Sequence, residues 1–276
     1  MTGMALVVSL AMLTISCQKD ETNDNGNNNG NTENPGEGSG VGNYNNQEYP
    51  STANVIRRAL TDIDGNIYDA VQIGNQIWMA ENLRTTKYAD STSIPLGNIY
   101  TGSGTAPYRY EPNNDNSNVS TYGYLYNWPA VMHGESSSET NPSGVQGICP
   151  TGWHVPSDAE WTQLTDYMKT QPAYMTSGNA DHLAKALAAT WGWNSSDEPD
   201  APGNNLNTNN ATGFSALPAG YSGGYYIGFG IGTSFQSATE IDNFSAYCRK
   251  LVYDGADVSR NNYIKSDAHS VRCIRD

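Results

Sequence analysis

The sequence predicts an α+β fold in which a few helices accompany many short strands and long polar loops. One observation is a capped helix that begins after Ser157. Another is a pair of strand-like runs, residues 67–73 and 76–80, joined by Gly74 and Asn75. The composition is also rich in glycine and tyrosine, with 28 and 18 of 276 residues. Such a composition favours turns and short strands over long helices.

Residues 4–15 are almost continuously apolar and are followed by Ser16 and Cys17. A run of about twelve residues is too short for a membrane-spanning helix, which needs about 20, but it suits a signal peptide. The segment resembles a bacterial lipobox, whose cysteine becomes the lipidated first residue of the mature protein. We therefore expect residues 1–17 to be a lipoprotein signal peptide that ends at Cys17. The alternative is a secretory signal that is cleaved without lipidation.

Residues 18–53 form a predicted tether. Residues 18–21 are similar to the charged signal that directs lipoproteins of the Bacteroidetes group to the outer face of the outer membrane, which is the location we expect. The following residues are mostly Asn, Gly, Glu and Thr. They bury too little apolar surface to offset the entropy lost on ordering. The globular domain is expected over residues 54–276.

The acidic balance of the chain limits its partners. The formal net charge is -14 and the sequence pI is near 4.5. Such a field repels phosphate backbones, so nucleic acid is not an expected partner.

Two runs near the start of the domain predict a β-hairpin. Residues 67–73 and 76–80 are separated by Gly74 and Asn75, a pair typical of tight turns. Upstream, residues 62–66 read Asp-Ile-Asp-Gly-Asn. This order does not fit an EF-hand loop, which needs a later glycine and a terminal glutamate, so we predict a turn.

Residues 85–118 form a long polar stretch that contains the triplet Glu111-Pro112-Asn113. The triplet is similar to the sugar-binding motif of calcium-dependent lectins, in which both polar side chains bind the metal. The interpretation we favour is a polar turn whose side chains mimic backbone hydrogen bonds. The alternative is that this triplet binds calcium. We expect no other cofactor. The aromatic run 122–128 predicts a strand.

Two helices are expected in the second half of the chain. Ser157 is a predicted N-cap, and Glu160 three residues later completes a capping box. An apolar face follows at helical spacing, formed by Trp161, Leu164 and Met168. A second, shorter helix is predicted over residues 181–189, and the chain has strand and turn character from residue 213 onward.

Several segments together resemble the Fibrobacter succinogenes major paralogous domain family. The resemblance covers nearly everything from about residue 60 onward, in the family's order. The segments that carry it are residues 64–68, 73–83, 122–128, 149–161, 213–220 and 270–276. Gln236 is a departure, because family members commonly carry tryptophan at that position.

The resemblance implies an α+β fold of the C-type-lectin-like kind, with two helices, small antiparallel sheets and long loops. The run 153–161 is also similar to part of the formylglycine-generating sulfatase-modifying proteins, which share that core. Cys149 and Cys273 occupy positions similar to those joined by a long-range disulfide in such domains, so we expect them to be bonded. Cys248 has no second cysteine beside it, so we expect a buried free thiol and no formylglycine-generating activity.

The histidines predict no metal site, because His133, His154, His182 and His269 lack metal-ligand spacing. For His154, which lies within the family motif, we expect hydrogen bonds from the ring to the backbone at the start of the helix.

We expect a non-catalytic binding or adhesion domain that recognises glycan or protein at the cell surface, because the family resemblance implies surface domains with no established reaction. Aromatic rings stack on sugars, and polar loops supply hydrogen bonds. The candidate binding residues are Trp191, Trp193, Tyr225, Tyr226, Asn114 and Asp115. For each aromatic residue the alternative is core packing. An enzyme acting on polysaccharide or protein, and a structural subunit of a surface assembly, remain as alternative functions.

Overall fold

The computed structural model describes residues 48–98 and 100–276. The predicted signal peptide, with Cys17, and nearly all of the predicted tether lie outside these residues. Within the described ranges, no helix is long and apolar enough to cross a bilayer.

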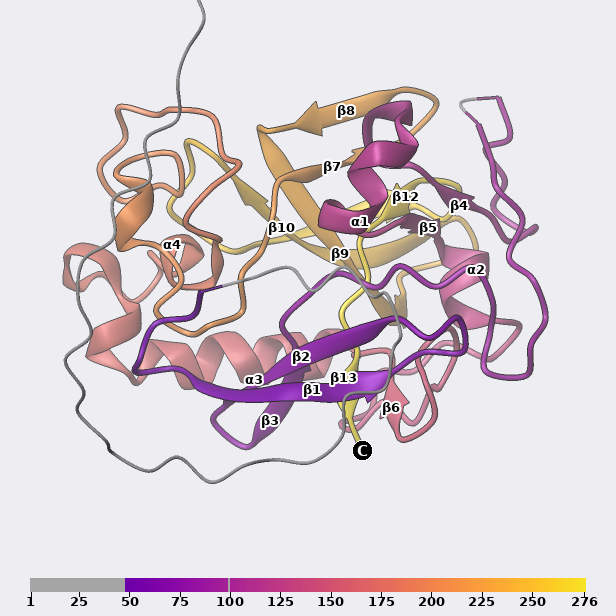
Figure 1. The fold of residues 1–276 in the computed structure, drawn as a ribbon, viewed down its shortest axis with the longest axis horizontal. Helices are drawn as coiled ribbons and strands as arrows, with labels where there is room; N and C mark the ends of the chain where they lie inside the picture. Colours follow the sequence, from indigo (N-terminus) through magenta and orange to yellow (C-terminus); the bar gives the residue numbers. More distant parts are fainter. Residues whose placement is uncertain (1–47, 99) are drawn as a thin grey trace, which may run out of the picture. The chain divides into compact units, whose positions relative to one another are not determined.

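Short helices and 3-10 turns lie between the strands, and one helix, α3, is longer than the rest (Figure 1). The α-helices in the described ranges are α1 (Val119–Tyr122), α2 (Trp128–Met132), α3 (Asp158–Lys169) and α4 (Ala184–Leu187). The 3-10 turns are η1 (Pro112–Asn114), η2 (Asn116–Asn118), η3 (Pro172–Tyr174), η4 (Thr176–Gly178) and η5 (Leu206–Thr208).

The strands form two sheets. The five-stranded sheet has the order β1 (Asn54–Thr61), β2 (Ile67–Ile73), β3 (Gln76–Met79), β13 (Ile274–Arg275) and β6 (Trp153–His154). The eight-stranded sheet has the order β11 (Ser259–Ile264), β10 (Ser245–Val252), β9 (Gly232–Glu240), β7 (Ala219–Ser222), β12 (Ala268–His269), β5 (Leu125–Asn127) and β4 (Arg109–Tyr110), with β8 (Tyr226–Phe229) paired to β7. The pairing of β7 with β9 is parallel, and the other strand pairs of these sheets are antiparallel. The mixture confirms the α+β class.

The local predictions near the first sheet are confirmed. β2 and β3 pair through the turn at Gly74, whose φ of +61° is one that glycine adopts without strain. The Asp62 carboxylate accepts hydrogen bonds from the backbone N–H groups of Asp64 and Asn66, at 3.0 and 2.9 Å. The segment 62–66 is therefore the predicted turn.

The capping box of α3 is also confirmed. The Ser157 hydroxyl accepts a hydrogen bond from the Glu160 N–H at 3.2 Å, and the Glu160 carboxylate accepts one from the Ser157 N–H at 2.9 Å. The predicted apolar face is buried. On it, the Trp161 ring lies 4.4 Å from Trp78 of β3 and 5.6 Å from Phe235 of β9, measured between ring centroids. This helix therefore joins the cores of the two sheets.

Two expectations about secondary structure were wrong in extent. The second helix covers four residues and not 181–189, because Ala188 is extended and forms a β-bridge with Ala216. In the run 122–128 only β5 is a strand, because Gly123, at φ +74°, separates it from α1. The long strand β9 lies in the stretch with predicted strand and turn character but was not predicted as an element of its own. It is almost entirely buried although most of its residues are polar or glycine.

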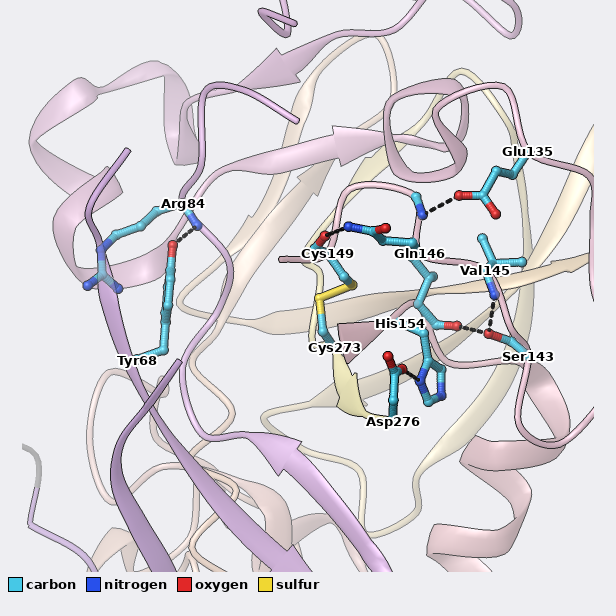
Figure 2. The surroundings of a disulfide bond; sticks show 12 residues. Tyr68, Arg84, Glu135, Ser143, Val145, Gln146, Cys149, His154, Cys273 and Asp276 are labelled. Carbon is cyan, nitrogen blue, oxygen red and sulfur yellow. Dashed lines mark hydrogen bonds and ion pairs between the residues drawn. A yellow bond between two sulfur atoms is a disulfide. The ribbon is translucent and has the colours of Figure 1, made fainter. Parts of the chain in front are cut away.

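The predicted disulfide is present. Cys149 is bonded to Cys273 across a sequence separation of 124 residues (Figure 2). Cys248 is a buried free cysteine, and desolvation raises the pKa of its thiol. Both findings agree with the sequence-based expectations.

Replacement of both bonded cysteines, Cys149→Ala with Cys273→Ala, should lower the free energy of unfolding by about 4–5 kcal/mol. The reason is that the disulfide closes a long loop and so restricts the unfolded chain. Urea unfolding of the native and double-variant proteins measures the difference. A reducing agent should lower the stability of the native protein by a similar amount and leave the variant unchanged. Equal stability of the oxidised native protein and the variant would contradict the expectation.

Candidate functional site

Aromatic side chains from three separate segments lie at β8, where the Tyr122 ring packs against Trp191 and Phe229. Tyr225 directly precedes β8, and Tyr226 is its first residue. We call these five residues, Tyr122, Trp191, Tyr225, Tyr226 and Phe229, the β8 aromatic face. The Tyr122 ring lies 6.1 Å from Trp191 and 4.8 Å from Phe229, between centroids. Trp191 is 44% exposed and Tyr225 is 72% exposed, while Tyr226 is half-buried. Figure 1 shows α1, which carries Tyr122, beside β8.

The polar turn that contains Asn114 and Asp115 lies against this face. η1 contacts both β7 and β8. Burial raises the pKa of the Tyr226 hydroxyl, and the nearby negative charge of Glu111 raises it further. Asn114 is exposed in the left-handed region at φ +55°. The Asp115 carboxylate accepts hydrogen bonds from the N–H and hydroxyl of Ser117, at 2.9 and 2.7 Å, as expected of a polar turn.

Trp193 does not belong to the face. Its ring is 5% exposed and packs in the core with residues such as Leu187 and Phe214. Trp191 and Trp193 lie two residues apart, yet only Trp191 offers its ring to solvent. For Trp193 the alternative interpretation, core packing, describes the structure.

A second group of polar side chains surrounds His154 near the disulfide (Figure 2). The Nδ1 atom of His154 lies 2.7 Å from Asp276 Oδ1, and its Nε2 atom lies 2.8 Å from Glu160 Oε1. The other Glu160 oxygen accepts hydrogen bonds from the backbone N–H groups of Ser143 and Ser157. The expectation that the ring bonds the backbone is therefore wrong, because its partners are carboxylates.

The His154 group links three segments of the chain. His154 and Glu160 are buried, and both nitrogens of the imidazole are occupied. Burial alone would lower the pKa of His154, but the two carboxylates outweigh it, so the pKa is raised above its ordinary value. The ring bridges β6, α3 and the segment at Asp276.

The fold and its sites thus define a disulfide-linked α+β domain with exposed aromatic side chains beside β8. The model of the family described as Fibrobacter succinogenes major domain matches residues 71–275, so the chain belongs to that family. No curated protein and no solved structure shows a match.

Two members of the aromatic face were not predicted as binding residues. Tyr122 lies in the aromatic run that was interpreted as a strand, and Phe229 lies in the Tyr- and Gly-rich segment. The composition of both segments was visible in the sequence. Their convergence was not, because it depends on the pairing of β7 with β8 and on the position of α1.

The His154 bridge should make stability depend on pH. Since the folded-state pKa is raised, the stabilisation is complete below the ordinary value of about 6.5 and is lost as the pH rises through the higher folded-state value. We expect His154→Gln to lower the free energy of unfolding by about 1–3 kcal/mol near pH 5.5 and by less near pH 8.5. Urea unfolding at both pH values measures this. An equal loss at both values would contradict the bridge.

Proposed function

We propose that this chain is a lipid-anchored cell-surface protein whose domain binds glycan through the β8 aromatic face. The observation that carries the proposal is the packing of Tyr122 against both Trp191 and Phe229, with the exposed ring of Tyr225 directly before β8. These side chains come from segments far apart in the sequence. Single exposed rings are ordinary on a protein surface, whereas a contiguous apolar patch is typical of a recognition site.

The geometry of the face suits a sugar ring. Tyr122 contacts Trp191 edge-on and Phe229 at a tilt, so the neighbouring rings restrict one another. A ring held in place loses little entropy when a ligand stacks on it. The adjacent turn adds the exposed side chain of Asn114 as a hydrogen-bonding group. Apolar stacking with polar contacts at the rim is the combination that a pyranose requires.

A C-type-lectin-like relationship accords with the long-range disulfide and with the few helices, and it remains part of the proposal.

A glycan array probed with the folded protein should give positive spots, and Trp191→Ala or Tyr225→Ala should weaken binding to them about tenfold each. The reason is that each substitution removes an exposed ring from the contact. Phe244→Ala is the matched control, since Phe244 is a 78% exposed aromatic residue outside the face. An empty array, or binding unaffected by both face variants, would refute the proposal.

The lipid anchor has its own test. In a host that processes bacterial lipoproteins, the native protein should incorporate labelled palmitate and remain with the membrane fraction. The Cys17→Ser variant should do neither, because the acceptor thiol is gone. Equal labelling of the two proteins would exclude Cys17 as the lipidation site.

A further inference from the structure

A cleft of about 420 Å³ opens beside His154, lined by the β2–β3 turn, the loop 141–146, α3 and the final strand. Figure 1 places β6 and β13, which border it, at the bottom of the view and β8 at the top. The cleft is therefore separate from the β8 aromatic face. A neighbouring hollow of about 590 Å³ shares Asn75 and Gln163 with it and continues along α3 to Tyr167.

The walls of the cleft carry side-chain amides with unused hydrogen-bonding capacity; these residues are Asn75, Asn141, Gln146 and Gln163. Asn141 Nδ2 donates to Gln163 Oε1 at 2.6 Å, and Gln146 Nε2 donates to the Cys149 carbonyl at 3.3 Å. No other side-chain hydrogen bond of these four residues occurs within the described part of the chain. Asn141 Oδ1, Gln146 Oε1, Gln163 Nε2 and the Asn75 amide therefore have no hydrogen-bond partner in the described part of the chain, although their residues line the cleft.

The floor of the cleft is, by contrast, fully bonded. Gln76 Nε2 donates to the Glu160 carbonyl at 3.0 Å, and Gln76 Oε1 accepts from the Trp78 indole at 3.3 Å. His154 and Glu160 beside it are bonded to each other and are buried. Because these hydrogen bonds already hold the side chains at the base of the cleft, those side chains lose little conformational entropy when a ligand binds.

Side chains of both charge signs line the cleft. His154 lies between the carboxylates of Glu160 and Asp276. Arg275 also lines the cleft, and no ion pair engages it in the part of the chain that the structure describes. In a chain of net charge -14, this local balance favours an uncharged ligand over a cation or an anion.

We propose that this cleft binds a short neutral saccharide through the unpaired amides of its walls. Its volume lies within the range of roughly 300 to 1,000 Å³ that small-molecule sites occupy. Each sugar hydroxyl both donates and accepts a hydrogen bond, as each side-chain amide does, and neighbouring hydroxyls match the two ends of one amide. The continuation along α3 gives space for more than one sugar ring. The choice of a sugar over other neutral ligands rests on the proposed glycan-binding function.

Binding can be followed by two-dimensional amide NMR of the isotope-labelled full chain. The probes are cellotriose, maltotriose, mannotriose and N,N′,N″-triacetylchitotriose, with trigalacturonic acid as the anionic comparison and acetylated, amidated triserine as a peptide. We expect at least one neutral trisaccharide to shift resonances around Asn75 and Gln163. Gln163→Ala should weaken that binding about tenfold, because an amide is lost from a half-exposed helix position where alanine is well tolerated. Asn262→Ala, an exposed amide on β11, is the matched control and should change nothing.

The two sites can be judged separately in the same experiment. Shifts confined to the β8 aromatic face, and abolished by Trp191→Ala, would overturn the cleft proposal and leave the proposed function standing. Shifts at the cleft that persist in Gln163→Ala, or that appear only with triserine or trigalacturonic acid, would also overturn it. Cleft binding that survives Trp191→Ala supports it. No response to any saccharide at either site would overturn both proposals.

Discussion

The buried guanidinium of Arg272 is the constraint on which both sheets depend. Its nitrogens donate to Asn82 Oδ1 and to the carbonyls of Met79, Phe214 and Ser215, at 2.7 to 3.1 Å. Burial lowers the pKa of this side chain to about 9, so it is still charged near pH 7. A buried charge without partners is very costly. The segments that follow β3 and precede β7 must therefore meet at this one side chain.

Next to Arg272, Cys273 adds a covalent bond to these hydrogen bonds. Cys273 is bonded to Cys149, which lies shortly before β6 and α3. α3 in turn places Trp161 between the two sheets. The end of the chain is thus fixed to the first sheet, to the segment before α3 and, through Phe214, to the approach to β7. The loops at both ends of the domain project from a framework that these contacts hold.

Features whose partners lie close in sequence could be predicted, whereas features with distant partners could not. Ser157 and Glu160 satisfy each other three residues apart, so the capping box was readable. Arg272 and Asn82 are separated by 190 residues, and nothing local indicates their contact. β9 escaped prediction for the same reason, since its buried Gln236 bonds the Tyr126 carbonyl, 110 residues away. Family resemblance, and not residue spacing, supplied the disulfide.

The pairing of basic side chains in this domain bears both on its stability and on the charge of the ligand that we propose. Basic side chains are scarce, and several are paired internally, as Arg249 and Arg260 are with Asp158 and Lys265 is with Glu240. The two arginine pairs fix α3 to the second sheet, and all three pairs leave few cations for an anionic ligand. The groups we propose for recognition are uncharged: the rings beside β8 and the amides beside His154. Recognition through these groups requires a ligand with apolar ring faces and many hydroxyls, and it would depend little on salt, because no counter-ion is released.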